Sequence, residues 1–404
     1  MERNIRLYPL YQAFWNALFW MPVFFLLFAS VLTPAEVLRL EAIYYLAVVL
    51  FEVPSGYLSD RVGRRVTLLI ATACWTGAGV VFALADSFGT FVVAQILLAG
   101  GMAFNSGTDT SLLYDSLAVL GRHDEMAQVE SRAASAGLYA GSIAALFGGL
   151  AGMFSLRLGY VLSSLAATGA MLVVWRFGEP PAGDAQVLPP ASQVVDCLRR
   201  LRNPALAWLF LFAVAMTVFD HVPYEFAQPW LGFLIVSAGG SARLTPMSSG
   251  VIVAVVALLG ALAAGRAVWL RSRLGIRPAL MVLMLLQVGV TTLGQWIHPL
   301  VLIALALRGV PDAVAGPIRN AAVHAHLHSG IRATWLSLQS LAGRLAFSGT
   351  LAIGSLFAGS GVALTPDRLS TLLVGFATAG GLTAVTMGGL AFIRWRRREP
   401  EGTA

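Results

Sequence analysis

Apolar stretches alternate with short polar segments along the whole chain of 404 residues. Each stretch is about 18 residues or longer, the length at which a helix crosses the roughly 30 Å hydrocarbon core of a bilayer. The pattern predicts an all-α polytopic membrane protein with twelve transmembrane helices. These lie near residues 7–29, 38–58, 66–84, 88–112, 132–154, 156–177, 205–236, 247–268, 278–297, 299–322, 333–358 and 369–394.

The longest polar segment lies between the sixth and seventh apolar stretches. It divides the chain into an N-terminal six-helix bundle (1–177), a cytoplasmic central loop (178–203), and a C-terminal six-helix bundle with a short cytoplasmic tail (204–404). A short repeat supports two pseudo-symmetric bundles. Arg61–Arg65 and Arg273–Arg277 share the pattern Arg-x-Gly-x-Arg, and they follow the second and the eighth stretch.

Composition and charge place the chain in a membrane. Only 12% of its residues are charged and 57% are hydrophobic, whereas soluble domains carry roughly 25% charged residues. All 27 basic residues are arginines, and most fall in alternate polar segments and at the two ends. Basic residues accumulate on the cytoplasmic side of membrane proteins. We therefore expect both termini to be cytoplasmic in a multi-pass protein of the inner or plasma membrane.

The arginine clusters also indicate which partners the chain contacts. They are short and lie between apolar runs, which favours contact with the lipid bilayer and argues against nucleic acid. The end of the central loop, residues 192–203, is expected to form a short surface helix near the lipid headgroups. Two cysteines, Cys74 and Cys197, exclude a disulfide framework and a cysteine-based metal cluster.

One polar loop carries a recognisable motif. Residues Gly56–Arg65 read Gly-Tyr-Leu-Ser-Asp-Arg-Val-Gly-Arg-Arg. This closely resembles the signature loop of the major facilitator superfamily, and with twelve spans and a central loop the resemblance covers nearly the whole chain. It implies two bundles related by an axis along the membrane normal, with the substrate site near the midplane.

The resemblance also implies a gate on the cytoplasmic side. Asp60 would face the start of the eleventh helix near residues 329–334, and Arg64 would reach Asp115 at the cytoplasmic end of the fourth. Gly63 permits a turn that other residues resist, and Gly56 is expected to allow close helix packing. The alternative is a simple positive anchor without a gating role. The gating candidates are Glu52, Gly56, Asp60, Arg61, Gly63, Arg64, Arg65 and Asp115.

The chain departs from the family's drug-efflux branch in two places. Gln95 stands where that branch typically has an arginine in the fourth helix. The fifth helix lacks the branch's Gly-Pro pair, although its glycines still predict close packing against a neighbouring helix. Both departures weaken an assignment to drug/proton antiport. The glycines concerned are Gly137, Gly141, Gly148 and Gly149.

Polar residues inside the predicted helices are candidate functional residues, because a charge at the helix centre costs about 2.5–3.5 kcal/mol on insertion scales. Many lie on the first, fourth, seventh and tenth helices, which line the cavity in the family that the chain resembles. Asp220 is the preferred proton-carrying acid, with Asp109 and then Glu225 as alternatives. The candidate substrate and proton pathway consists of Gln12, Trp15, Asp109, Asp220, Tyr224, Glu225, Arg308, Asp312 and Arg344.

Several of these residues also have a purely structural interpretation. Arg308 and Asp312 lie four apart and could neutralise each other. Glu225 could be solvated at the outer surface, and Trp15 could serve in packing alone. The seventh helix contains Pro223 and Pro229, and we expect these prolines to break or kink it.

The resemblance implies a secondary active transporter that works by alternating access. The favoured interpretation is proton-coupled efflux of a small amphipathic drug or metabolite, with the small-molecule substrate, protons and the bilayer as partners. An alternative is a proton-coupled uptake symporter for a polar or anionic solute, and a more distant one is a membrane enzyme or a non-transporting receptor. We expect a monomer without catalytic residues, metal site or cofactor, since no nucleophile–base, metal-spacing or phosphate-binding motif is present.

Overall fold

The structure is a computed structural model that describes residues 1–181, 190–327, 329–358 and 364–395. These residues form helices and connecting turns, without a β-strand among them, as the sequence predicts. The middle of the predicted central loop lies outside the described residues. The helices are α1 (Glu2–Trp15), α2 (Phe24–Ala29), α3 (Pro34–Val62), α4 (Arg64–Leu84), α5 (Phe88–Asn105), α6 (Thr108–Val119), α7 (Met126–Gly152), α8 (Leu156–Trp175), α9 (Pro190–Arg200), α10 (Pro204–Ser237), α11 (Thr245–Ala264), α12 (Ala267–Leu274), α13 (Ile276–Leu293), α14 (Val301–Leu307), α15 (Val310–His326), α16 (Ser329–Phe357) and α17 (Pro366–Trp395).

Within the described residues, ten helical segments are long and apolar enough to cross a membrane. They coincide with the third to the twelfth predicted helices, so the structure supports ten of the twelve. The second predicted helix is α3, whose 29 residues correspond to about 43 Å at 1.5 Å per residue. It is long enough to span a bilayer, but it carries more charge than the other ten. Its charged residues are Glu36, Arg39, Glu41, Glu52, Asp60 and Arg61.

The first predicted helix, 7–29, is wrong as a continuous helix. α1 ends at Trp15, α2 begins at Phe24, and the residues between them are not helical. Pro22 contributes to the interruption, because it has no amide hydrogen to donate and disfavours helical geometry in the preceding residue. Composition gave no sign of this, since the interrupted segment is almost as apolar as its flanks.

Glycines of α7 and α8 make room for the non-helical segment between α1 and α2. A Cβ atom on Gly148 would lie 2.1 Å from the Phe19 carbonyl oxygen, and one on Gly159 would lie 2.9 Å from the same atom. A Cβ on Gly141 would lie 3.2 Å from the Asn16 carbonyl oxygen. Irregular backbone at membrane depth is tolerated where protein surrounds it. The predicted close packing of the fifth helix is confirmed. Its partner is this irregular segment at Gly141 and Gly148, and α11 at Gly149.

The described chain divides into two compact units. Unit 1 comprises Met1–Ala185, Leu231–Ala254 and Ser348–Leu364, and unit 2 comprises Gln186–Trp230, Val255–Phe347 and Thr365–Ala404. These units differ from the bundles predicted at 1–177 and 204–404, because parts of α10, α11 and α16 belong to unit 1. The predicted bundles stay a prediction.

Contacts inside unit 1 explain why these parts of α11 and α16 belong to it. α11 crosses α7 at small residues, where a Cβ on Gly250 would lie 2.4 Å from the Ala145 carbonyl oxygen. The hydroxyl of Ser348 on α16 donates a hydrogen bond of 2.8 Å to the carbonyl oxygen of Ala42 on α3. Such close approach between helices is the usual consequence of small residues at the interface.

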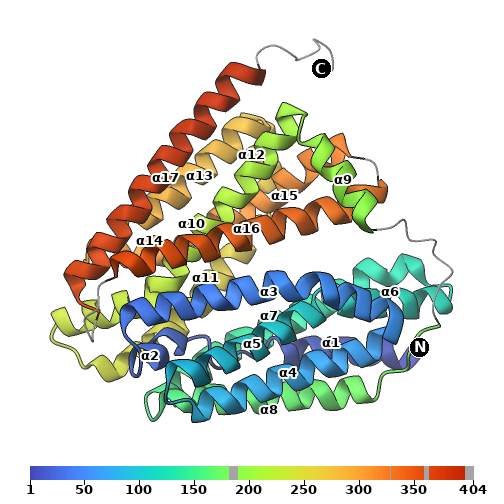
Figure 1. Cartoon of the computed structure of the whole chain (residues 1–404), viewed down its shortest axis with the longest axis horizontal. Coiled ribbons are helices and arrows are strands. Elements are labelled where there is room, and N and C mark those ends of the chain that lie inside the picture. Colours follow the sequence, from blue (N-terminus) through green and yellow to red (C-terminus); the bar gives the residue numbers. More distant parts are fainter. Residues whose placement is uncertain (182–189, 328, 359–363, 396–404) are drawn as a thin grey trace. The chain divides into compact units, whose positions relative to one another are not determined.

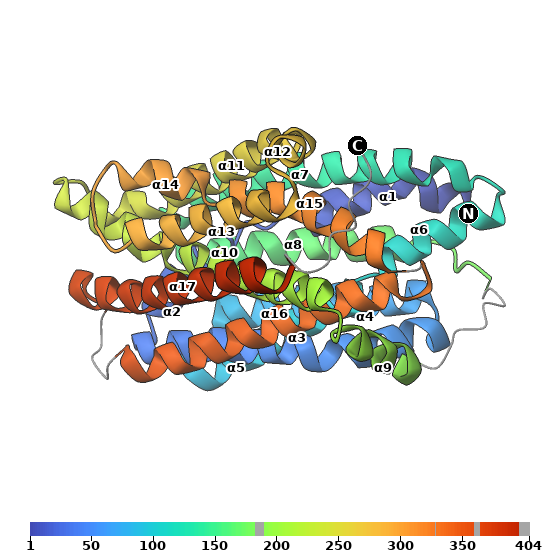
Figure 2. The ribbon, with the colours of Figure 1, turned by 90° about the horizontal axis from the view of Figure 1, so that it is seen from above.

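Each unit is held together by neighbouring helices. In unit 1, α4 packs against both α5 and α8, and α3 packs against α5 (Figure 1). An aromatic cluster at one end consists of Phe28, Phe82, Phe91 and Tyr160, whose adjacent rings lie 4.5–6.2 Å apart. In unit 2, α13 packs against α15 and α17 (Figure 2).

Two further predicted helices are each built from two pieces. The fourth changes direction at Gly107, whose φ of +73° favours glycine, so that α6 begins just before Asp109. The tenth is interrupted between α14 and α15, at Arg308 and Gly309. By contrast, α10 continues through Pro223 and Pro229 without a break. A kink at these prolines stays a prediction.

Candidate functional site

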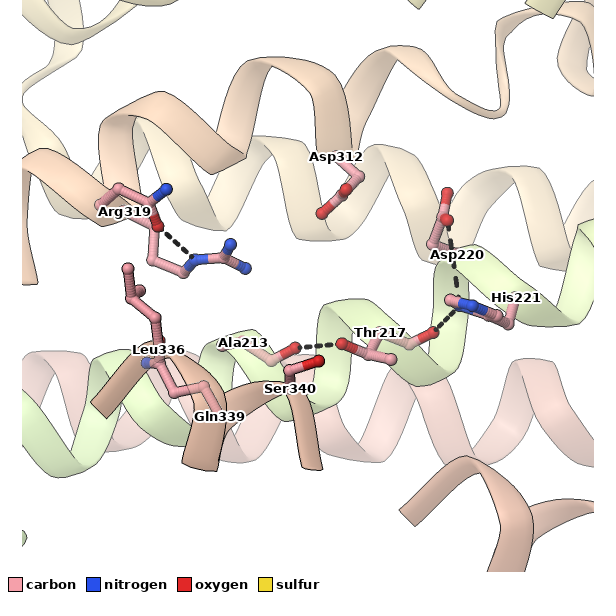
Figure 3. Close-up of a pocket in the computed structure, with 10 residues that line it drawn as sticks. Ala213, Thr217, Asp220, His221, Asp312, Arg319, Leu336, Gln339 and Ser340 are labelled. Atoms are coloured by element: carbon pink, nitrogen blue, oxygen red, sulfur yellow. Dashed lines mark hydrogen bonds and ion pairs between the residues drawn. The ribbon is translucent and has the colours of Figure 1, made fainter. Parts of the chain in front are cut away.

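A cavity of about 290 Å³ lies inside unit 2, between α10, α15 and α16. Figure 3 shows its side chains pointing toward one another from the three helices. The volume is at the lower end of the roughly 300–1,000 Å³ of small-molecule pockets. The lining residues are Ala213, Thr217, Asp220, His221, Asp312, Arg319, Asn320, Leu336, Gln339 and Ser340.

The α10 wall presents a polar stripe. Thr217, Asp220 and His221 lie three and four residues apart, a spacing that places side chains on one helix face. The Nδ1 atom of His221 lies 2.7 Å from the Thr217 carbonyl oxygen and 4.0 Å from Oδ2 of Asp220. The Asp220 side chain is 27% exposed, so its carboxyl group is accessible from the cavity.

The α15 wall presents both signs of charge. Asp312 lies in the first turn of α15, where the helix dipole favours an anion, and Arg319 follows about two turns later. In Figure 3 both side chains point into the cavity that Asp220 faces. Among the described residues, neither Asp220 nor Asp312 accepts a side-chain hydrogen bond.

Arg308 lies beside this cavity at the break between α14 and α15. Its side chain is only 7% exposed, and its guanidinium carbon lies 5.2 Å from the centre of the Tyr224 ring, a cation–π distance. Within the described part of the chain, Arg308 forms no ion pair with Asp312. The interpretation that the two residues neutralise each other is therefore wrong, because the helix is interrupted between them.

The α16 wall adds uncharged polar groups, from Gln339 and Ser340. Gln339 is only 4% exposed. Its Oε1 atom is buried and has no hydrogen-bond partner among the described residues. A buried acceptor without a partner carries an energetic cost. A ligand donor at this position would remove that cost.

Asp109 belongs to a separate polar cluster in unit 1. Its Oδ2 accepts hydrogen bonds from Nε2 of Gln12 at 2.6 Å and from the Tyr8 hydroxyl at 3.4 Å. Its position in the first turn of α6 also suits an anion. These two hydrogen bonds connect α1 to α6. Close by, the Tyr11 hydroxyl donates to Oδ1 of Asn105.

The other pathway candidates are buried to different degrees. Glu225 is fully buried, with 0% exposure, so its interpretation as a solvated surface residue is wrong. Arg344 is half-buried on α16, and its charge acts on His221. Trp15 is buried against Trp75, with ring centres 4.5 Å apart, which supports a packing role.

The signature loop makes the contact expected at its centre. Nε of Arg64 lies 3.3 Å from Oδ2 of Asp115, and NH1 of Arg64 lies 2.6 Å from Oδ1 of Asp60. NH1 also donates to the Ser59 hydroxyl at 2.8 Å. Arg64 therefore connects α3, α4 and α6 within unit 1. The gating role of these residues stays a prediction.

Sequence reasoning missed Glu179, which completes this loop. Its two carboxylate oxygens accept hydrogen bonds from the backbone amides of Arg64 and Arg65 at 2.6 and 2.8 Å. These amides belong to the first turn of α4, where an anion is stabilised by the helix dipole and the unsatisfied amides. Its position, just after the sixth apolar stretch, was the only available signal.

The glycines of the motif differ in role. Gly63 has a φ of +113° and precedes α4, and Gly275 has a φ of +79° and precedes α13. The repeated loops therefore share a left-handed glycine at the same place. The expectation for Gly56 is wrong, because a Cβ there would meet no described atom within 4 Å.

The remaining gating candidates make local contacts. The Arg61 guanidinium carbon lies 5.1 Å from the centre of the Tyr57 ring. NH2 of Arg65 donates to the Trp175 carbonyl oxygen at 2.7 Å, which ties the loop to the end of α8. The Ser106 hydroxyl donates to Oε1 of Glu52 at 3.3 Å. Of these contacts, the one made by Arg65 joins the loop to α8, and the one made by Glu52 joins α3 to the residue that follows α5.

Comparison with known proteins gives a family match and many fold matches. The family model described as Major Facilitator Superfamily matches residues 11–350, whereas no curated protein matches the sequence. The nucleoside transporter NupG is similar in structure, with 13% identity, coverage of 97% of this chain and 99% of that chain, and a TM-score of 0.80.

Transporters of other solutes also share the fold. An auto-inhibited POT family peptide transporter has 15% identity, coverage of 100% of this chain and 99% of that chain, and a TM-score of 0.71. A D-xylose–proton symporter has 14% identity, coverage of 93% and 96%, and a TM-score of 0.66. At such low identities the likeness concerns the fold alone.

Proposed function

Because the chain belongs to the Major Facilitator Superfamily, a family of transporters rather than enzymes, we propose that it is a proton-coupled secondary active transporter of a small polar solute. The observation that carries the proposal is the cavity in unit 2. Eight of its ten lining residues are polar or charged. Transport would follow the alternating-access mechanism of the family.

The lining supports a polar solute over an amphipathic one. Pockets for drug-like molecules are lined predominantly by apolar and aromatic side chains, with few polar groups, whereas only Ala213 and Leu336 are apolar here. A solute with several hydroxyl or amide groups would satisfy Gln339, Ser340 and Thr217. The nucleoside, sugar and peptide transporters that share the fold carry solutes of this kind.

Asp220 is the residue that we assign to proton coupling. Asp220 and Asp312 face one cavity, and two carboxyl groups at one site can share a proton. In the part of the chain that the structure describes, neither accepts a side-chain hydrogen bond, whereas Asp109 accepts two. The contrast supports Asp220 as the proton site and leaves Asp109 a role in holding α1 against α6.

We further propose twelve membrane crossings with both termini in the cytoplasm of a plasma or inner membrane. α3 would provide the second crossing and α1 with α2 the first. The arginine distribution supports this orientation. In it, the signature loop lies at the cytoplasmic surface, where Asp60 and Arg64 would stabilise the outward-facing form.

Uptake into proteoliposomes tests the proposal. The purified protein is reconstituted with a pH-sensitive dye inside, and radiolabelled uridine, D-xylose and dialanine are offered separately under proton gradients of either direction. Gradient-dependent accumulation of one solute, with proton movement, supports the proposal. The direction of the effective gradient distinguishes uptake from efflux. Gradient-dependent transport of amphipathic dyes instead, with none of the polar solutes carried, would contradict it.

A further inference from the structure

A buried acid–amide pair lies in unit 1, whereas the cavity described above belongs to unit 2. Nε2 of Gln95 on α5 donates a hydrogen bond of 2.8 Å to Oε1 of Glu41 on α3. Glu41 is 6% exposed and Gln95 is 2% exposed. Neither residue takes part in the transport mechanism proposed above.

Among the described residues, no cation forms an ion pair with Glu41. α2, α5 and the part of α16 in unit 1 contain no charged residue. Burying an ionised carboxylate without a compensating charge is very costly, so a buried acid of this kind becomes neutral. The titratable groups of α3 and α4 are Glu36, Arg39, Tyr44, Tyr45, Glu52, Tyr57, Asp60, Arg61, Arg64, Arg65 and Cys74. Among the described residues, the hydrogen bond to the Glu41 side chain comes from Gln95.

The charged neighbours on α3 are engaged at its exposed start. Glu36 accepts hydrogen bonds from the backbone and hydroxyl of Thr33, and Nε of Arg39 donates to the Ala35 carbonyl oxygen. They therefore complete the helix start rather than neutralise Glu41.

The decisive observation concerns the carbonyl oxygen of the Gln95 side-chain amide. Oε1 of Gln95 is buried and has no hydrogen-bond partner among the described residues. A carboxylic acid and a primary amide have complementary edges, each with one donor and one acceptor. A proton on Oε2 of Glu41 would donate to Oε1 of Gln95 and satisfy both side chains.

We propose that Glu41 is a proton-binding site, in which the proton is held by a reciprocal acid–amide pair with Gln95. The ligand is a proton, and the site is distinct from Asp220. Loss of the proton would leave an anion beside the lone pairs of Gln95 Oε1, and it would weaken the attachment of α3 to α5.

The position of the pair links it to a contact between helices of unit 1. The residue after Glu41 is Ala42, whose carbonyl oxygen accepts the hydrogen bond from Ser348 of α16. A protonated Glu41 holds this part of α3 in place, so protonation favours the contact between Ala42 and Ser348. Alkaline pH would weaken the contact as the proton is lost.

Infrared spectroscopy of the protein in lipid tests the proton site without any transported solute. The wild type should show a protonated-carboxyl absorption that is absent from Glu41→Gln and disappears from the wild type as pH is raised. Gln95→Leu should shift this band, because the acid loses its amide partner. The exposed acid Asp367 provides the control variant Asp367→Asn, which should leave the band unchanged. Identical spectra of wild type and Glu41→Gln at all pH values would overturn the proposal, and an unshifted band in Gln95→Leu would overturn the reciprocal pair.

Crosslinking tests the link to α16. Cysteines replace Ala42 and Ser348 in a background that lacks Cys74 and Cys197, and a short thiol crosslinker is added at increasing pH. Crosslinking with Glu41 present should fall at alkaline pH relative to the same protein with Glu41→Gln, which keeps a neutral amide there. Both proteins share the pH dependence of thiol chemistry. Parallel pH profiles would show that the proton does not control this contact.

Discussion

Gly63 and Glu179 meet at the start of α4, and each constrains the other. Gly63 has a left-handed backbone conformation, and a Cβ there would lie 2.8 Å from the Glu179 carboxyl carbon. The glycine could be predicted from the motif, because it is part of the signature pattern. Glu179 could not be predicted, because only the folded chain brings it to the amides of Arg64 and Arg65.

Replacing Gly63 should therefore destabilise the protein. We expect Gly63→Ala to lower the free energy of unfolding by about 1–3 kcal/mol from the backbone conformation alone, with an added loss if Glu179 is displaced. Thermal unfolding of the purified protein measures the effect. The matched control is Gly56→Ala in the same motif, where a Cβ has open space and the melting temperature should not fall. Equal melting temperatures for the two variants would contradict this account.

Asp60 and Arg64 carry a second prediction, which concerns the gate. Asp60→Asn should reduce transport while leaving expression and thermal stability close to those of the wild type. The ion pair at 2.6 Å has an exposed partner, so its loss should cost little stability. The control is Asp86→Asn, an exposed acid between α4 and α5 that is outside the motif. Unchanged transport in Asp60→Asn would favour a simple positive anchor.

At the scale of the elements, the length and apolar composition of the stretches predicted the third to twelfth helices well, because these two properties decide whether a segment suits a bilayer. Length and composition could not predict where a helix breaks. The interruption after Trp15, the turn at Gly107 and the break at Gly309 all depend on neighbours that accept irregular backbone. Pro223 and Pro229 did not break α10, which continues through both.

The glycine lining of the interrupted segment gives a direct prediction. Gly148→Ala would place a Cβ 2.1 Å from the Phe19 carbonyl oxygen, and overpacking of this kind costs about 1–3 kcal/mol. The variant should melt at a lower temperature or express poorly. Gly289→Ala on α13, where a Cβ meets nothing within 4 Å, is the control. A Gly148→Ala protein as stable as the control would mean that α7 does not support this segment.

Helix α9, which follows the central loop, supplies a prediction about pH. Cys197 is 1% exposed, and burial, with the neighbouring Asp196 charge, raises the pKa of its thiol. Because the thiolate is the reactive form, alkylation at neutral pH should be slow and should accelerate as pH rises. Mass spectrometry of a Cys74→Ser protein treated with maleimide measures the rate. Denaturation should make labelling fast, whereas rapid labelling of the native protein would contradict the burial of Cys197.

At the scale of the whole molecule, the signature motif and the twelve apolar stretches were sufficient to predict the family, which the match over residues 11–350 confirms. The cavity was only partly predictable. Asp220 and Asp312 stood out as charged residues on apolar helices, but Gln339 and Ser340 join them in the cavity only through the packing of α16. Glu41 escaped notice because its significance depends on Gln95, more than fifty residues away.

The central claim is that Asp220 couples a proton to solute movement through the cavity of unit 2. The most direct measurement compares wild type, Asp220→Asn and the exposed control Asp367→Asn in proteoliposomes, using the polar solute that the wild type accumulates. Asp220→Asn should lose gradient-driven accumulation and proton movement, yet retain exchange of labelled for unlabelled solute, because exchange needs no net proton transfer. Asp367→Asn should behave as the wild type. Unchanged gradient-driven accumulation by Asp220→Asn would contradict the account.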